Sequence, residues 1–202
     1  MKTYLKIKRL FDIIISSSSI IMLSPIYFII AVTVKITSEG PIIFKQKRIG
    51  HNQKMFTLYK FRTMVKNAEQ LKEKYRHLNE ADGPVFKIAN DPRFTKIGRF
   101  LSKTNLDELP QFLNVLKGDI SIVGYRAPTP DEVKKYERWH FERFKGIPGM
   151  TSLWAISGNH NKFKFDEWIK MDIDYNNNPS FLIDLKIIGT TGINMIKNLI
   201  KK

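Results

Sequence analysis

Residues 104–126 read TNLDELPQFLNVLKGDISIVGYR, and the fold and the site can be built outward from this stretch. Apolar side chains recur in it at helical spacing, at Leu106, Leu109, Phe112, Leu113 and Leu116. The spacing predicts a helix that ends near Gly118. Asp107 and Glu108 lie in or just before its first turn, where the positive end of the helix dipole favours anions. Carboxylates in this place can cap the helix, bind Mg²⁺ or attack phosphorus.

Motifs on both sides of this stretch extend the pattern over essentially the whole chain. They are KFRTM at 60–64, GPVFK at 83–87, DPR at 91–93, LDELPQ at 106–111, NVLKGDIS at 114–121, VGYR at 123–126, PGMT at 148–151 and DLKII at 184–188. In this order they resemble the signature of the bacterial sugar transferases, the monotopic phosphoglycosyl transferases. These enzymes begin the assembly of polysaccharides and glycoconjugates on a membrane lipid.

The resemblance implies a transferase that moves a sugar 1-phosphate from a nucleotide sugar, expected to be a UDP-sugar, to polyprenyl (undecaprenyl) phosphate. It implies a covalent aspartyl-phosphosugar intermediate and a place at the first membrane step of exopolysaccharide, capsule or glycoconjugate synthesis. Asp107 is then the nucleophile and also touches the metal, with Glu108 as a metal ligand or an acid/base. Magnesium suits this chemistry because it prefers oxygen ligands and bridges carboxylate to phosphate.

Cations close to the transferred phosphate would offset its charge. The candidates for these contacts all lie in matching motifs: Lys60, Arg62, Arg93 and Arg126. Arginine suits the task because its planar fork pairs with phosphate oxygens bidentately. The competing interpretation is an ordinary one. Each cation could be a solvated charge, and Asp107 or Asn105 could cap the helix with Glu108 completing a capping box.

Composition limits the classes of partner. The 202 residues suit one domain of ordinary size, and the absence of cysteine excludes disulfides and a thiolate nucleophile. A net charge of +15 predicts an anionic partner: nucleic acid, anionic lipid or a phosphorylated substrate. No nucleic-acid-binding motif is recognised, so a nucleic-acid partner is not expected. A homo-oligomer is left open.

The N-terminal segment favours membrane lipid as a partner. No residue from Ile13 to Val34 is charged, and a straight helix of that length would be roughly 33 Å long, enough to cross a bilayer. Ser24 and Pro25 lie at its middle, and proline there breaks the helix. Basic clusters flank both ends, which favours both ends on the cytoplasmic face. We therefore expect a re-entrant helix, with a single span and a signal peptide as the alternatives.

These expectations combine into one architecture. The resemblance implies a mixed, helix-rich α/β fold in a monotopic membrane protein of the bacterial cytoplasmic membrane. Residues 1–36 form the re-entrant helix hairpin and residues 37–202 the catalytic domain on the cytoplasmic face. The amphipathic segment Asp184–Lys202 is expected to lie at the membrane interface or to be an ordinary core helix. Other predicted helices cover 66–79, 94–102, 131–144 and 165–175, and predicted strands 55–59, 120–123 and 153–157.

The chain also departs from the family pattern. The family usually has arginine where this chain has Ser102, Ile147 and Asn159, and glutamine where it has Ala155. Asp172 matches an acidic position late in the family pattern. Two interpretations are open for it: a place near the site, or a structural role. The departures keep a second hypothesis open, in which a catalytically weakened family member acts as a membrane scaffold or a regulator of polysaccharide synthesis.

Overall fold

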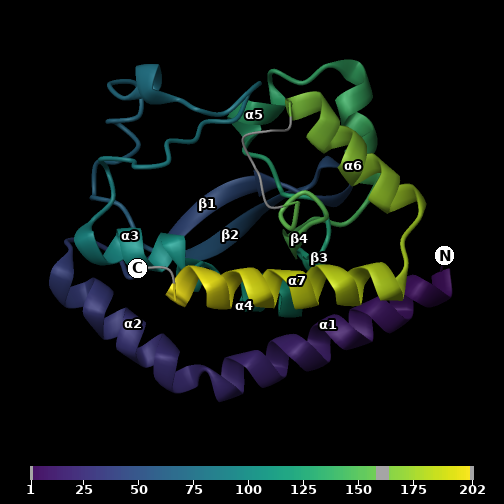
Figure 1. The fold of residues 1–202 in the computed structure, drawn as a ribbon, viewed down its shortest axis with the longest axis horizontal. Helices are drawn as coiled ribbons and strands as arrows, with labels where there is room; N and C mark the ends of the chain where they lie inside the picture. The colour runs from purple at the N-terminus through teal and green to yellow at the C-terminus, as the bar shows by residue number, and fades with distance from the viewer. Residues whose placement is uncertain (1, 158–163, 201–202) are drawn as a thin grey trace.

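A computed structural model describes residues 2–157 and 164–200 of the protein. Figure 1 shows a long bent pair of helices along one side, with the other helices and two small sheets lying against it. The helices are α1 (Lys2–Met22), α2 (Ser24–Thr37), α3 (Lys96–Lys103), α4 (Gln111–Lys117), α5 (Pro130–Val133), α6 (Phe165–Asn177) and α7 (Phe181–Ile200). The strands are β1 (Ile43–Ile49), β2 (Met55–Phe61), β3 (Ser121–Val123) and β4 (Gly149–Thr151). Tighter 3₁₀ turns cover His51–Gln53, Arg76–Leu78, Leu106–Glu108 and Arg138–Lys145.

The N-terminal helix pair is bent by 63° where α1 gives way to α2. Pro25 lies in the first turn of α2, where its ring and missing N–H prevent α1 from continuing straight. The hydroxyl of Ser24 donates a 2.8 Å hydrogen bond to the carbonyl of Ile21. The helices thus meet at the two residues where the break was predicted, and its place in a membrane stays a prediction. Among the described residues, no single helix has the length and apolar character of a bilayer span, whereas α1 and α2 together do.

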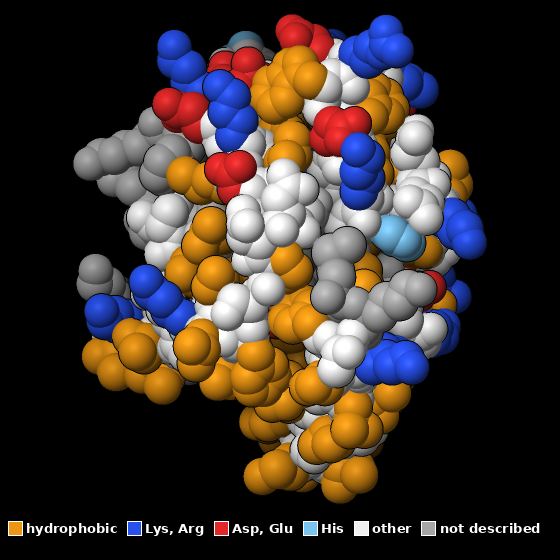
Figure 2. All heavy atoms as spheres, turned by 90° about the vertical axis from the view of Figure 1, so that its right-hand side faces the viewer, with side chains coloured by type: hydrophobic (Ala, Val, Ile, Leu, Met, Phe, Trp, Pro, Cys, Tyr) orange, Lys and Arg blue, Asp and Glu red, His pale blue; other side chains and the backbone are white. Residues whose placement is uncertain are grey.

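The inner side of the bent pair is polar along α1 and apolar along α2, where Ile30 and Val34 are buried, while its outer side exposes many large apolar side chains. Lys8, Asp12 and Ser16, spaced four residues apart on α1, are buried against the rest of the protein. Lys6 and Lys35 are exposed toward the two ends of the pair. The large apolar side chains exposed along it are Leu5, Ile7, Leu10, Ile13, Ile14, Ile21, Met22, Ile26, Phe28, Ile29, Val32 and Ile36. Figure 2 shows hydrophobic side chains gathered along this lower side of the molecule. A helix on the surface of a water-soluble protein instead turns its apolar side chains to the core and its polar side chains to the solvent.

Each sheet has two strands, antiparallel for β1 and β2 and parallel for β3 and β4. The registers pair Ile43 with Phe61, Ile49 with Met55, Ser121 with Gly149, and Val123 with Thr151. The parallel pair requires glycine at its closest approach, because a Cβ on Gly149 would lie 2.1 Å from the backbone nitrogen of Gly124. This contact places the chain after β3, which carries Arg126, beside β4.

Two apolar clusters connect the bent helices to the rest of the fold. One joins α2, β2, α3 and the turn that follows α3, and its buried members are Ile30, Val34, Phe61, Leu101 and Leu109. The other joins β2, α4, β3, α6 and α7, and its buried members are Leu58, Val115, Ile120, Ile122, Val123, Tyr175 and Ile187. Lys8 also forms a buried ion pair with Asp184 of α7, at 2.8 Å. Both halves of the bent pair are therefore packed into the fold.

Most predicted elements are present, but three predictions were wrong. Residues 66–79 form turns and one 3₁₀ turn instead of a helix, because Ala68 is the only buried side chain among them and no apolar face exists to pack. The helix predicted at 131–144 is divided into α5 and the turn Arg138–Lys145, since Glu137 between them is extended. Residues 153–156 form a turn, and the strand lies earlier, at β4. The division of the chain at residue 36 stays a prediction.

Candidate active site

Asp107 and Glu108 lie in a short 3₁₀ turn, Leu106–Glu108, directly before α4. Asn105 precedes the turn with left-handed backbone angles (φ 57°, ψ 14°), and its side chain makes no capping hydrogen bond. The predicted alternative of an Asn105 cap is therefore wrong. The Asp107 side chain is buried, with 7% of the residue exposed, while Glu108 is half-buried. A buried carboxylate that caps no helix suits a chemical role.

Lys60 reaches this turn from the end of β2. Its ammonium lies 2.5 Å from a carboxylate oxygen of Glu108 and 3.9 Å from one of Asp107. Burial raises the pKa of Asp107 to about 7; Lys60 opposes the rise and the charge of Glu108 adds to it. Two carboxylates and one ammonium therefore lie together, and Asp107 changes charge near neutral pH. The sequence singled out the dyad, and it singled out this lysine as a phosphate contact; both roles stay predictions.

The position of Lys60 depends on Asn114, a residue that the sequence analysis did not single out. Asn114 lies on α4 and is fully buried. Its side-chain oxygen accepts the backbone N–H of Tyr59 at 3.0 Å, and its amide donates to the carbonyl of Thr57 at 2.7 Å. The amide thus bonds to the edge of β2 that β1 does not cover, in the way a neighbouring strand would. An amide in the middle of an apolar helix was the signal that could have revealed it.

Arg126 belongs to a second charged group, whose arginines interact with the charge of Glu108. It forms a two-pronged ion pair with Glu132 of α5, at 2.9 and 3.1 Å, and its guanidinium lies 5.6 Å from the ring centre of Trp168. Burial would raise the pKa of Glu132, but Arg126 and the nearby Arg48 hold it below its ordinary value. The charge of Glu108 acts on both arginines. Glu132 therefore holds Arg126 at a place where its charge interacts with that of Glu108.

A buried ion pair fixes the backbone at Arg126. Arg143 lies 2.5 Å from Asp172 of α6, and both side chains are almost fully buried. Arg143 also donates to the carbonyl of Arg126 at 3.0 Å. Burial raises the pKa of Asp172 to about 6, with Arg143 opposing the rise. Asp172 therefore acts through Arg143, an arginine that no motif in the sequence marks.

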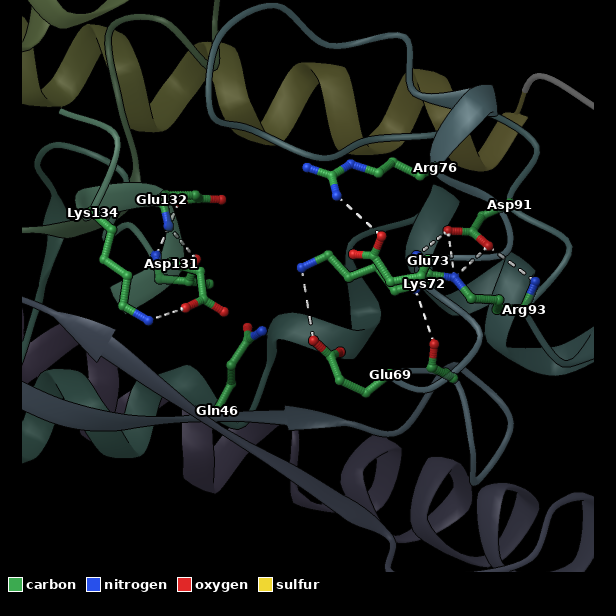
Figure 3. A network of polar contacts seen from close by, with 12 residues as sticks. Gln46, Glu69, Lys72, Glu73, Arg76, Asp91, Arg93, Asp131, Glu132 and Lys134 are labelled. Atoms are coloured by element: carbon green, nitrogen blue, oxygen red, sulfur yellow. Dashed lines mark hydrogen bonds and ion pairs between the residues drawn. The ribbon is translucent and has the colours of Figure 1, made fainter.

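The other two predicted cations bind protein groups. Arg62 is buried beside the end of α2, where it donates to the carbonyl and the hydroxyl of Ser38 at 2.7 and 2.8 Å. Arg93 pairs with both oxygens of Asp91 and donates to the carbonyl of Ala68 at 3.1 Å. Figure 3 shows the Arg93–Asp91 pair beside the ion pairs of the segment after β2. The phosphate contacts predicted for Arg62 and Arg93 stay predictions.

The dyad offers a metal ion two carboxylates. No cluster of three or more His, Cys, Asp or Glu side chains that could hold a metal occurs within residues 2–157 and 164–200. Magnesium differs from zinc in this respect, because proteins usually hold it through one or two carboxylates, with waters and substrate phosphates completing the shell. Asp107 and Glu108 fit that requirement. Their role as Mg²⁺ ligands stays a prediction.

The departures from the family pattern lie at scattered places in the fold. Ser102 lies in the last turn of α3, Ile147 precedes β4, and Ala155 lies in the turn after β4. Each is half-buried. Asn159 lies outside the described residues.

The family model described as bacterial sugar transferase matches residues 3–198. The chain belongs to this family. The family resemblance predicted from the motifs is thereby confirmed over nearly the whole chain, and with it the assignment as a transferase.

Individual relatives carry more specific names. The chain is 51% identical over 152 residues to the galactosyl transferase CpsE of Streptococcus agalactiae, covering 75% of this chain and 34% of CpsE. It is 36% identical to the exopolysaccharide production protein ExoY of Rhizobium meliloti, covering 91% of this chain and 83% of ExoY. It is 39% identical to the undecaprenyl-phosphate galactose phosphotransferase of Salmonella typhimurium, covering 92% of this chain and 39% of that protein. The chain thus spans most of ExoY but only about a third of CpsE.

Proposed function

We propose that this protein transfers a sugar 1-phosphate from a UDP-sugar to polyprenyl phosphate at a membrane surface. The observation that carries the proposal is the buried Asp107, paired with Glu108 and Lys60 in a turn that packs on the bent helix pair. The names of relatives, including a UDP-glucose:undecaprenyl-phosphate glucose-1-phosphate transferase of Klebsiella pneumoniae, indicate the same chemistry.

The chemistry proceeds in two displacements. The ionised carboxylate of Asp107 attacks the phosphorus that bears the sugar. The bond from this phosphorus to the oxygen that bridges the two phosphates breaks, and UMP leaves with that oxygen. A phosphate oxygen of polyprenyl phosphate then attacks the same phosphorus. The acyl phosphate bond breaks, which releases polyprenyl-diphosphate sugar and regenerates Asp107.

Lys60 and Glu108 assist both displacements. The ammonium of Lys60 lies beside both carboxylates, so it favours the ionised form of Asp107 and offsets charge on the incoming diphosphate. Arg126 supplies a further cation at the edge of the site. A Mg²⁺ ion held by Asp107 and Glu108 would neutralise the diphosphate and its leaving group.

We also propose that the bent pair enters and leaves the cytoplasmic leaflet on the same face. Its outer side exposes many large apolar side chains, and the rest of the protein lies within the angle of the bend (Figure 1). Basic residues at both ends of the pair favour the cytoplasmic side. Exposed Leu182, Leu185, Ile193, Ile196 and Ile200 make α7 a second element with lipid-facing side chains.

A transfer assay tests the proposed reaction. The full chain in detergent is mixed with polyprenyl phosphate, Mg²⁺ and one member of a panel of UDP-sugars, and UMP release and sugar-labelled lipid are measured. We expect UMP and labelled lipid in equal amounts with at least one donor, and neither after EDTA is added. Failure with every donor would favour the scaffold hypothesis instead.

A further inference from the structure

We infer that Tyr27 is a positioning residue for Asp107, because its hydroxyl holds the backbone of the catalytic turn in place from the bent helix pair. Tyr27 lies on α2, in the first turns after the bend. Its hydroxyl donates a 2.6 Å hydrogen bond to the carbonyl of Leu109, two residues beyond the nucleophile. This inference rests on the proposed function, since it concerns the same carboxylate.

The catalytic turn needs such support, because its local sequence disfavours its conformation at both ends. Asn105 has positive φ, a left-handed conformation that glycine adopts freely and that side-chain-bearing residues adopt less often. Leu109 has helical backbone angles (φ −49°, ψ −41°), although Pro110 favours an extended conformation in the residue before it. Tertiary contacts must therefore fix the turn, and Tyr27 provides one of them.

The hydrogen bond is also well placed to act on the nucleophile. The carbonyl of Leu109 accepts both the Tyr27 hydroxyl and the N–H of Phe112, which links the turn to the start of α4. The Tyr27 ring packs against Phe61, with ring centres 5.8 Å apart, directly after Lys60 in β2. The one side chain thus contacts the elements that carry Asp107 and Lys60, while its own element is the second half of the bent pair.

This arrangement gives the bent pair a role beyond attachment. The second half of the pair, α2, carries Tyr27 to Leu109 and packs on the fold through Ile30 and Val34, so a helix proposed to contact lipid is also part of the scaffold of the site. Loss of the hydroxyl should let the turn shift and misplace the carboxylate relative to phosphorus. Misplacement of a reacting group slows the chemical step more than it weakens the binding of a substrate held by other residues.

The test compares Tyr27→Phe with two matched variants in the full-length protein. Tyr4→Phe also removes a hydroxyl that ties the bent pair to the rest of the fold, but its bond goes to Asp184. Ile30→Val loosens the cluster that contains Tyr27 and leaves the hydroxyl intact. For each variant, kcat and the donor KM of UMP release, the melting temperature and co-sedimentation with vesicles are measured.

We expect Tyr27→Phe to lower kcat roughly five- to tenfold with a donor KM within about twofold of wild type. Tyr4→Phe and Ile30→Val should lower the melting temperature while keeping kcat. An unchanged kcat in Tyr27→Phe overturns the inference, and so does a loss of activity that follows only the loss of folded protein in all three variants. An inert wild type would instead defeat the proposed function and the inference with it.

Discussion

The ammonium of Lys60 lies 2.5 Å from the carboxylate of Glu108, although 48 residues separate them in the chain. The contact brings the end of β2 to the turn before α4 and places a cation beside the proposed nucleophile, Asp107. Asn114 on α4 binds the backbone of β2 next to Lys60, and Tyr27 on α2 binds the backbone just after Glu108. The dyad therefore depends on four separate elements for its geometry.

Replacing Lys60 should move the pH dependence of transfer. Lys60 favours the ionised form of Asp107, so Lys60→Met raises the pKa of Asp107 further. The attacking group must be ionised, hence the rising limb of the pH–rate profile shifts to higher pH, and activity at pH 7 falls more than activity at pH 9. UMP release measured across this range checks the shift. Lys54→Met, at an exposed lysine just before β2, is the control, and equal profiles for the two variants would refute this role.

Asp107→Asn should abolish transfer and stabilise the metal-free protein at high pH. The pKa of Asp107 is raised to about 7 in the folded state, against about 3.9 in the unfolded chain. The contribution of Asp107 to the stability of the wild type is therefore fully present below about pH 4 and is lost as pH rises through 7. Asparagine carries no charge, so we expect the variant to be more stable by roughly 2–4 kcal/mol at pH 8 in EDTA.

Thermal unfolding at pH 8 and near pH 4 measures this difference. The advantage of Asp107→Asn should vanish at the lower pH, where both forms of the protein are neutral at this site. A variant less stable than wild type at pH 8 would count against a desolvated carboxylate.

Breaking the buried pair of Arg143 and Asp172 should destabilise the fold. Arg143→Met leaves the Asp172 carboxylate buried without its cation, and we expect a loss of roughly 3–5 kcal/mol. Adding Asp172→Asn should recover part of this loss, because the remaining side chain is then uncharged. Melting temperatures of the single and double variants test the pair, and additive losses would show that the two residues do not act together.

Charges on the outer side of the bent pair should weaken membrane binding. Ile21 and Phe28 are both more than 70% exposed, and each would bury its side chain in lipid. The double variant Ile21→Glu, Phe28→Glu should reduce partition into phospholipid vesicles by roughly 100-fold or more. Leu78→Glu, an exposed leucine in the 3₁₀ turn Arg76–Leu78, is the control and should bind vesicles like wild type. Equal binding by the two would contradict the proposed membrane face.

The sequence predicted helix ends and bends that a single glycine or proline determines. The end of α4 at Gly118 follows from a left-handed glycine after an apolar helical stripe, and the bend after α1 follows from Pro25. The helix predicted at 66–79 failed because charged residues with helical propensity had no surface to pack on. The one predicted at 131–144 failed because Glu137 donates its N–H to His140, which starts a new turn.

The dyad and its lysine were predictable, whereas the residues that position them were not. Asp107, Glu108 and Lys60 belong to recognisable motifs, so the sequence singled them out, and their chemical roles stay predictions. Tyr27, Asn114 and Arg143 act through contacts with residues far away in the chain, and no local pattern reports those contacts. Arg62 and Arg93 show the converse, since their places in motifs did not reveal that both bind protein groups.

Intact-protein mass spectrometry tests the central claim most directly. The wild type and Asp107→Asn are mixed with the active UDP-sugar and Mg²⁺ in the absence of polyprenyl phosphate. We predict that the wild type gains the mass of one sugar phosphate on Asp107, that it loses this mass when acceptor is added, and that the variant gains nothing. An enzyme that completes transfer without ever carrying the adduct, or one that carries it on another residue, would contradict the account.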